Sequence, residues 1–544
     1  MLFVTNSNAY YHYKKEQQRM FFYKSQQNIY SFDIKPAEHE EPIETIGRVS
    51  TDISVNKEYI QKLFSLPQNG DIVVREFDIN VSSKPVAALV ICVEGLSNSA
   101  SVNDFILRSL MDGRDEETDY DLQTVIKRML IPQAQVSVKE NIDDALSAVN
   151  IGNAVLFVDG LDIAFSMDVK SWEHRSVSNP DNETVVQGPH EGFNEVLRCN
   201  TALIRKTLNT PNLVMENITV GKTSKSPGAV VYLKNVTNQS LIDEVKRRIS
   251  SIDAEYVLSS LDVEQYIEED SFLPVPQMVT TERPDRVCKA LTEGRVAFVL
   301  NGSSHVLIMP ATFFDLITSA EDEYLRYPYS LLVRILRYLA VFLALLFPAF
   351  FAAVLNFHPE LLLTNILLAV SSSRALVPFG IFTELILMEV AFELIKEAGI
   401  RVPGPIGSTI GIVGGLIVGQ AAVDANLVSP IMIIIVAVTG IASFTVPSYS
   451  LSFAFRFSRF LYILGGGLMG LFGVAAVFFI NTLLGVGVKS FGVPFMSPIS
   501  PVGNVNKASI IFGAPIWKRG AKRENYLKPK DMYKKAKISR KWRY

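Results

Sequence analysis

Hydrophobic residues are concentrated in the last third of the chain, in long runs without acidic or basic side chains. The first run, 338–359, has 22 residues. A helix of that length measures about 33 Å and can cross a hydrocarbon core of roughly 30 Å. Further runs cover 402–423, 425–455 and 460–488. Buried helices of soluble proteins seldom stay uncharged over such lengths, so the pattern predicts membrane spans.

The stretch between the first and second runs is less regular. It starts apolar, is interrupted at 371–374, and resumes with the carboxylates Glu384, Glu389 and Glu393. Intramembrane acids usually face a bundle interior or water. Two interpretations stay open. One is a broken helix lining a polar path, with these three carboxylates as candidate ion-path residues. The other is an amphipathic helix at the membrane surface.

Glycines recur at intervals of four in the second run, at Gly407, Gly411, Gly415 and Gly419. Small residues at this spacing let two helix backbones approach closely in lipid. The stripe therefore predicts helix packing, within the chain or between copies. The last run contains a similar glycine cluster at 465–473.

The preceding part of the chain, from about 53 to 318, alternates short apolar strands with helical patterns. We expect strands at 71–75, 86–93, 154–159, 163–167, 230–233 and 296–300, and helices at 102–111, 195–206 and 240–249. This mixture predicts an α/β or α+β region with two subdomains, followed by a polytopic α-helical membrane domain. No internal repeat is evident in the sequence.

The net charge also differs between the parts of the chain. Residues 1–329 contain 31 basic and 47 acidic side chains, a net charge of −16, whereas 518–544 contains 12 basic and two acidic ones. The chain as a whole carries only −3, because these parts cancel. Its three cysteines lie in unrelated contexts, which favours reduced thiols in the cytosol. We expect these units: an extension 1–50, subdomains 51–187 and 188–329, a membrane domain 330–517 and a basic tail 518–544.

Basic residues near the ends of the apolar runs predict the orientation. Arg334 and Arg337, Lys396 and Arg401, Arg456 and Arg459, and the tail all favour the cytosolic side. Residues 1–30 lack the apolar core of a secretory signal, so the acidic region is expected in the cytosol. An even number of crossings is then required. The clear apolar runs do not supply one, so the sequence predicts an additional partial crossing or a re-entrant middle piece.

The sequence contains no catalytic motif that would indicate an enzyme. It has no P-loop, no dinucleotide-binding glycine pattern and no Gly-x-Ser-x-Gly motif. Its six histidines show no metal-ligand spacing. We therefore predict no enzymatic activity, no metal and no cofactor.

Two polar segments of the acidic region stand out. The first contains Gly188, Pro189, Glu191, Gly192 and Phe193, with Asn200 and Arg205 in the helix that follows. The second runs through Glu282, Arg283, Pro284 and Asp285. Each is interpreted either as a loop held by hydrogen bonds or as an inter-subunit or ligand contact.

These two segments resemble motifs of a known family, the A subunits of GerA-type spore germination receptors. The likeness continues through Glu293-Gly294-Arg295-Val296, the residues 321–326 before the first span, Arg401-Val402-Pro403 and 497–501. The motifs occur in the family's order over roughly 50 to 520, in soluble and membrane parts alike.

The resemblance implies a multi-pass protein of the spore inner membrane with a cytosolic amino-terminal domain. It also implies a transporter-like B subunit, a lipoprotein C subunit and homo-oligomers that conduct cations when a nutrient binds a partner subunit. An accessory protein of the dipicolinate channel, a non-conducting scaffold and a transporter are the alternatives. The basic tail is expected either to bind anionic lipids or to be an unstructured topogenic segment, and no nucleic-acid partner is expected.

Overall fold

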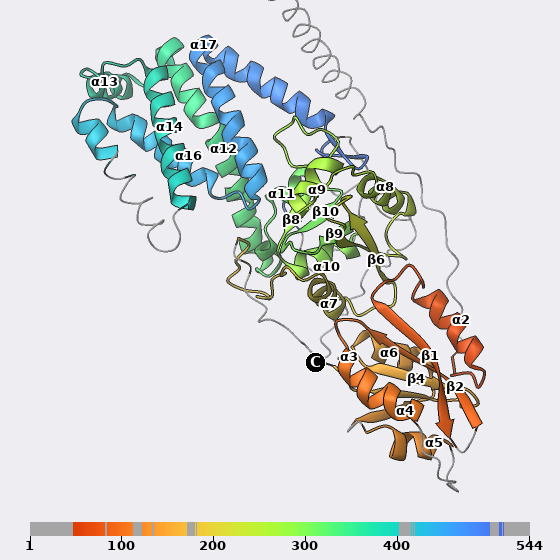
Figure 1. Ribbon diagram of the computed structural model, residues 1–544. Coiled ribbons are helices and arrows are strands. Elements are labelled where there is room, and N and C mark those ends of the chain that lie inside the picture. The colour runs from red at the N-terminus through yellow and green to blue at the C-terminus, as the bar shows by residue number, and fades with distance from the viewer. Residues whose placement is uncertain are drawn as a thin grey trace, which may run out of the picture.

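The computed structural model describes residues 47–81, 84–112, 122–132, 135–170, 180, 182–401, 415, 417, 419–500, 511–513 and 515. Two α/β halves lie at one end of the molecule and a bundle of long helices at the other (Figure 1). The basic tail and nearly all of the amino-terminal extension lie outside the described residues.

The first half is built on a five-stranded antiparallel sheet in the order β1-β2-β4-β5-β3. β4 is buried along its whole length because helices cover both faces of the sheet. Asn141 caps helix α6 by accepting a hydrogen bond from the backbone of Asp143. The elements are α2 (Ile53–Leu63), β1 (Ile72–Val81), β2 (Lys84–Val93), α3 (Ser99–Ser101), η1 (Val102–Leu107), α4 (Arg108–Asp112), α5 (Leu122–Val125), η2 (Ile126–Leu130), β3 (Val136–Lys139), α6 (Ile142–Asn150), β4 (Ala154–Val158) and β5 (Ala164–Met167).

The second half has a five-stranded sheet in the order β6-β7-β9-β10-β8. Its two faces form separate hydrophobic clusters, one under α7 and α10 and the other under α8 and α9. The strands and helices predicted from the sequence in both halves are confirmed, with boundaries shifted by a few residues. The elements are α7 (Leu197–Thr207), β6 (Leu213–Val220), β7 (Ser226–Leu233), α8 (Gln239–Ser250), α9 (Ser260–Ile267), β8 (Val279–Thr281), α10 (Pro284–Thr292), β9 (Val296–Leu300), β10 (Val306–Met309), α11 (Phe313–Ile317) and η3 (Ala320–Glu323).

The two halves repeat one another, which the sequence analysis did not detect. Both sheets have the same strand order, and α10, β9 and β10 begin 142 residues after α6, β4 and β5. Equivalent hydrogen bonds hold the entering chain. The amide of Gly160 donates to Thr51 O, and that of Gly302 donates to Glu195 O. Both glycines adopt positive φ in the same strand-to-strand turn. The α/β region is therefore an internal duplication.

The helical part starts with α12 (Tyr327–Phe357). It continues with η4 (Pro359–Leu361), α13 (Thr364–Ser373), α14 (Ile381–Arg401), α16 (Pro430–Ser443) and α17 (Tyr449–Gly487). Among the described residues, α12 and α17 are long and apolar enough to cross a membrane, and α16 is a shorter apolar helix. Most of the predicted span 402–423 lies outside the described residues.

The structure corrects two predicted spans. The run 425–455 is not one helix, because α16 ends at Ser443 and α17 begins at Tyr449 after a turn. The run 460–488 is not one straight span either. At Gly470 the chain adopts φ 62° and ψ −145°, outside the helical region, and doubles back. Asn481 Nδ2 consequently reaches the Tyr462 hydroxyl at 3.3 Å, and the two arms of α17 diverge from one bend in Figure 1.

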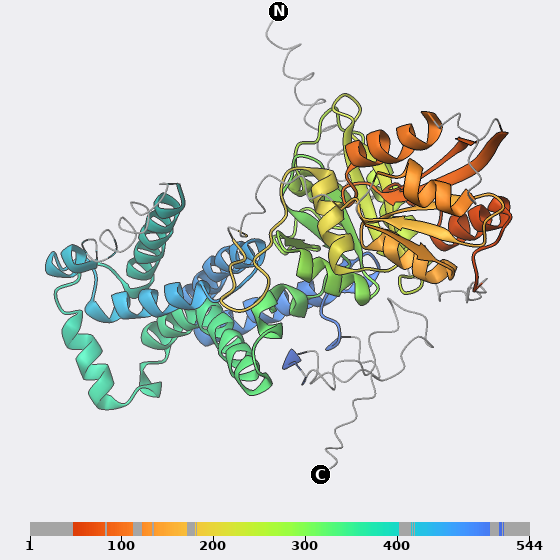
Figure 2. The same ribbon diagram turned by 90° about the horizontal axis from the view of Figure 1, so that it is seen from below.

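Contacts along the bundle show that the chain leaves the α/β region and returns to it. Gly466 of α17 lies against Ala349 of α12, and Gly470 against Phe357, so α12 and the first arm of α17 run in the same direction, away from the sheets. The second arm runs back. After it, a short hairpin of β11 (Lys489–Ser490) and β12 (Val493–Pro494) packs on the second half. Figure 2 shows the bundle extending to one side of the paired halves.

Candidate functional site

The carboxylate of Glu384 lies inside the bundle. Its side chain is fully buried, and Oε1 accepts hydrogen bonds from the backbone amide and hydroxyl of Ser429, both at 2.6 Å. Arg374 Nη2 lies 3.2 Å from the other oxygen. Ser429 is the residue that precedes α16, so one carboxylate ties α14 to the start of α16 and to the segment after α13.

Glu389 and Glu393, one turn apart on α14, share a second charged cluster. Arg459 of α17 lies between them, with Nη1 3.3 Å from Glu389 and Nη2 2.9 Å from Glu393. Arg456 Nη1 also contacts Glu393, at 3.1 Å. The Arg459 and Glu389 side chains are 1% and 0% exposed. Two carboxylates and two guanidinium groups thus balance their charges within the bundle.

The two arginines are functional-site candidates that the sequence analysis did not select. It used Arg456 and Arg459 only as indicators of orientation, because they flank an apolar run. Both are buried. Their spacing of three residues places them on one helical face, as the spacing of four does for Glu389 and Glu393. Matching these spacings could have suggested the pairing, but only the fold brings α14 against α17.

The predicted glycine stripe is only partly visible. Gly407 and Gly411 lie outside the described residues. A Cβ at Gly415 would meet nothing within 4 Å, and one at Gly419 would make ordinary contact with Ile433. Close backbone approach occurs instead in α17, where a Cβ on Gly466 would lie 2.6 Å from Ala349 O and one on Gly473 would lie 2.0 Å from Gly465 O.

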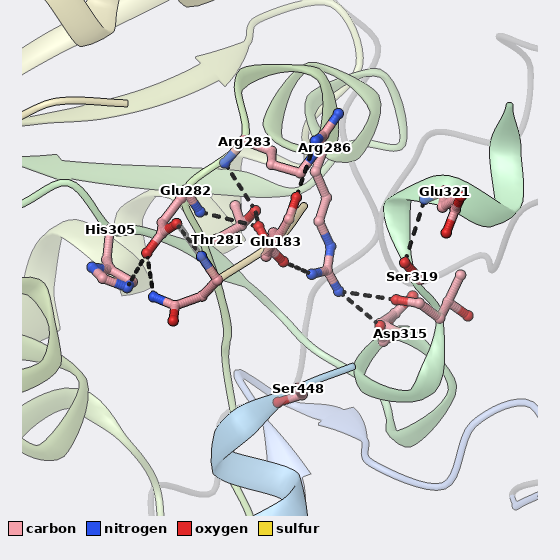
Figure 3. Close-up of polar contacts among 12 residues, drawn as sticks. Glu183, Thr281, Glu282, Arg283, Arg286, His305, Asp315, Ser319, Glu321 and Ser448 are labelled. Carbon is pink, nitrogen blue, oxygen red and sulfur yellow. Dashed lines mark hydrogen bonds and ion pairs between the residues drawn. The ribbon is translucent and has the colours of Figure 1, made fainter. Parts of the chain in front are cut away.

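The motif residues of the α/β region form a hydrogen-bonded network around the start of α10. Glu183 accepts hydrogen bonds from the Thr281 hydroxyl and the Glu282 amide and pairs with Arg286, as Figure 3 shows. Glu282 itself contacts His305 Nε2 at 3.1 Å and Asn182 Nδ2 at 2.7 Å. The chain that joins the two halves is thereby fastened to the second half.

Arg283 extends this network on the other side of α10. Its guanidinium donates to Glu183 O at 3.1 Å and Pro189 O at 2.9 Å and forms an ion pair with Asp285 at 2.8 Å. Pro284 is the first residue of the helix, where a missing amide proton costs nothing. Asp285 also accepts from the Tyr324 hydroxyl. The Tyr324 ring leaves no space for a Cβ at Gly188, whose φ is +136°.

Of the remaining motif residues, Arg205 joins the two halves and the others fix the chain before α7. Arg205 is fully buried, and its guanidinium donates to Asp71 of the first half at 2.5 and 2.8 Å. Asn200 fixes the turn before α7 through Asn194, and buried Phe193 donates its amide to Glu282 O. Glu191 pairs with Lys206 at the surface, and Gly192 lies between these contacts.

A further ion pair joins the α/β region to the first long helix. Asp322 is 1% exposed, and its carboxylate accepts from Arg337 of α12 at 2.7 and 3.1 Å. Arg334 Nε lies 3.4 Å from the same carboxylate. Arg334 and Arg337, which the sequence analysis used to predict orientation, therefore also fix the start of α12 on the second half. Within the described part of the chain, no group of three or more histidine, cysteine or acidic residues could hold a metal ion.

Comparison with known proteins identifies the family. The model described as Bacillus/Clostridium GerA spore germination protein matches residues 58–526. The chain is 34% identical over 472 residues to Spore germination protein KA of Bacillus subtilis (strain 168), covering 87% of this chain and 86% of that protein. It is 36% identical over 490 residues to the Uncharacterized membrane protein YfkQ of the same organism, covering 87% and 94%.

Spore germination protein GerLA of Bacillus cereus is 34% identical over 431 residues, covering 79% of this chain and 87% of that protein. Among solved structures, the N-terminal domain of the A subunit of the Bacillus megaterium spore germinant receptor GerK3 matches with 28% identity and a TM-score of 0.39. That match covers 50% of this chain and 99% of the other. The family match spans both the α/β halves and the helical bundle, and the chain therefore belongs to the GerA family of spore germination proteins.

Proposed function

We propose that this chain is the A subunit of a nutrient-responsive germinant receptor in the spore inner membrane, and that several copies form a cation-conducting path. A transporter-like B subunit and a lipoprotein C subunit are its proposed partners, and nutrient binding to a partner opens the path. The main support is the family match, which runs through both parts of the chain. The buried charges of the bundle are the physical feature that suggests conduction, because acidic residues attract cations in channels.

The carboxylates Glu384, Glu389 and Glu393 are proposed to lie on that path. In the present conformation each one is paired with an arginine. A paired carboxylate attracts a cation weakly, because the guanidinium cancels its charge. We therefore assign this conformation to a closed state, in which the pairs must separate before the carboxylates can serve cations. A ligand can drive that separation only to the extent that it binds the open state more tightly.

Cation flux through the reconstituted chain in liposomes tests this proposal. Glu389→Gln and Glu393→Gln should reduce selectivity for cations over anions. Arg459→Gln should raise basal cation leakage, because it frees Glu389 and leaves Glu393 with Arg456 alone. Glu360→Gln, which changes an exposed carboxylate at the far end of the bundle, is the matched control. Unchanged leakage and selectivity in all variants would remove these carboxylates from the path. A wild-type complex that never conducts would favour the scaffold.

The glycine stripe 407–419 is proposed to pack helices, between copies or within one chain. Gly411→Leu should reduce the yield of assembled complex on size-exclusion chromatography, because a branched side chain separates helices that glycine lets approach. Assembly at normal yield would show that the stripe is not an interface.

A further inference from the structure

The hairpin that follows α17 contains a residue that is poorly suited to its backbone. Residues 488–496, here called the C-terminal hairpin, include β11, β12 and a two-residue turn at Phe491 and Gly492. Both turn residues have positive φ, 47° and 78°. Turns of this type strongly prefer Asn-Gly, because a bulky side chain is disfavoured in the left-handed region. A phenylalanine here requires a compensating contact.

That contact is with a hydrophobic cluster of the second α/β half. Phe491 is 1% exposed and joins the hydrophobic cluster that includes residues of α8 and α9. The guanidinium of Arg248 lies over the ring, 4.2 Å from its centre. Arg248 is itself held by Glu244 at 2.7 Å and Glu269 at 3.2 Å. Glu269 also accepts the Gly492 amide at 3.2 Å, so the turn and the arginine share one carboxylate.

The rest of the hairpin reaches the opposite face of the same sheet. The Ser490 hydroxyl donates to Gln277 O at 2.5 Å and accepts the Ala311 amide at 3.0 Å. Val488 and Phe495 belong to the cluster that also contains Val341 of α12 and Leu451 of α17. The hairpin thus contacts both clusters of the second half and the bases of the first and last long helices.

The first strand of the hairpin is joined to α17 by a single residue. α17 ends at Gly487 and β11 begins at Lys489, so only Val488 separates the helix from the first strand of the hairpin. At its other end, the returning arm of α17 starts at the bend of Gly470. A displacement of this arm is therefore passed directly to the hairpin, and release of Phe491 removes one of the contacts that hold the hairpin on the second half. Packed elements of this kind switch between discrete positions and do not deform continuously.

We propose that the C-terminal hairpin, with Phe491 as its anchor, couples the second α/β half to the returning arm of α17 and so regulates opening of the path. This inference rests on the proposed function. The hairpin is docked in the closed state, and Phe491 leaves the hydrophobic cluster when the path opens.

Two variants test the coupling. Phe491→Asn suits the turn but removes the anchor, and Ser490→Ala removes two hydrogen bonds while the anchor stays. Hydrogen exchange of the full chain in nanodiscs should increase in 488–496 and in α8 for Phe491→Asn, without change in α6 of the first half. Tyr256→Ser, at an exposed position of the same half, should leave exchange unchanged. If Phe491→Asn raises exchange throughout the chain, that variant has misfolded. The exchange of Ser490→Ala in 488–496 and its nutrient response then test the coupling.

The functional readout is cation release from liposomes that contain the receptor with its B and C subunits. In Phe491→Asn, the ratio of nutrient-triggered release to basal leakage should fall at least tenfold, because loss of the anchor favours the open state. In Ser490→Ala the ratio should fall by less. An undocked hairpin with an unchanged nutrient response would overturn the coupling while leaving the channel intact. Absence of cation release from the wild type under any nutrient would instead overturn the proposed function and the coupling with it.

Discussion

Arg205 shows how a single buried charge can organise the α/β region. Its guanidinium crosses from α7 of the second half to Asp71, which lies 134 residues earlier in the chain and immediately before β1. Both side chains are almost completely buried. A charge in such a place is tolerated only while its partner remains, because an unpaired buried ion loses its hydration without compensation. The pair therefore specifies how the two halves meet.

Asp71→Asn should destabilise the α/β region by about 3–5 kcal/mol, the usual cost of removing one member of a buried ion pair. Denaturant unfolding of the full chain in detergent, followed by tyrosine and tryptophan fluorescence, measures the change. Lys62→Ala removes an exposed pair with Glu58 and should cause no measurable change. Equal midpoints for Asp71→Asn and the wild type would show that the halves do not depend on this contact.

Glu264 on α9 provides a pH-dependent contribution. Burial raises the pKa of its carboxyl to about 7, against a smaller lowering by the Thr280 hydroxyl. Because the folded-state pKa lies above the unfolded one, the unfolded chain releases the proton first. The contribution of Glu264 to the free energy of unfolding is therefore fully present below about pH 4.5. It is lost as the pH rises to about 7, a decrease of at most roughly 3 kcal/mol.

Glu264→Gln should remove much of this loss, raising the unfolding temperature at pH 8 more than at pH 5. The pH dependence of the unfolding temperature that remains in this variant should come from Glu268. The pKa of Glu268 is also raised to about 7, by burial and by the charge of Glu264. Thermal unfolding of the full chain at both pH values measures it. Glu255→Gln, at an exposed position of the preceding loop, is the control. A variant whose slope equals that of the wild type would contradict the assignment.

At the scale of elements, the bend of α17 decides the arrangement of the bundle. Glycines on both sides of Gly470 let the two arms approach so closely that Cβ atoms at Gly465 and Gly473 would collide with the facing arm. The uncharged run predicted a helix here, because hydropathy reports which residues avoid water. Hydropathy does not report where the backbone reverses. The glycine cluster was visible in the sequence, but it is equally consistent with packing against another helix.

Gly473→Ala should prevent the bend from closing, since its Cβ would lie 2.0 Å from a backbone oxygen that cannot move alone. Overpacking of this kind typically costs about 1–3 kcal/mol, and here the yield of monodisperse protein in detergent should fall severalfold. Gly487→Ala, where a Cβ would meet nothing within 4 Å, should behave as the wild type. Normal yield of both variants would argue against the doubled-back α17.

At the scale of the whole molecule, the bundle begins and ends on the same α/β half. Asp322 holds the start of α12, and the C-terminal hairpin holds the end of α17. A basic tail on the cytosolic side was predicted to require an even number of crossings. The bend at Gly470 provides a returning segment that hydropathy did not indicate. The duplicated α/β halves then lie together on the side from which the chain enters and to which it returns.

Cysteine labelling in sealed vesicles tests this topology. In a background without the three native cysteines, Leu363→Cys and Met469→Cys at the far end should react from one side of the membrane. Tyr256→Cys and Lys489→Cys should react from the other. Position 489 is expected on the side of the α/β halves because it follows the second arm of α17, which runs back toward them. Labelling of Lys489→Cys together with Leu363→Cys would contradict the even crossing.

The division into an acidic α/β region, an apolar helical region and a basic tail is evident in the amino-acid sequence, since it follows from local hydrophobicity and charge. Six of the ten strands, three of the helical stretches, and motifs such as Arg205 and Arg283 that indicate the family, could also be recognised from it. What these side chains contact depends on the tertiary fold. Asp71 with Arg205, Glu389 with Arg459 and Phe491 with Arg248 are pairs that local patterns cannot reveal, because their partners lie 70 to 243 residues apart. The duplication was hidden for a related reason: a repeated backbone requires the same pattern of burial and turns, which many different residues satisfy.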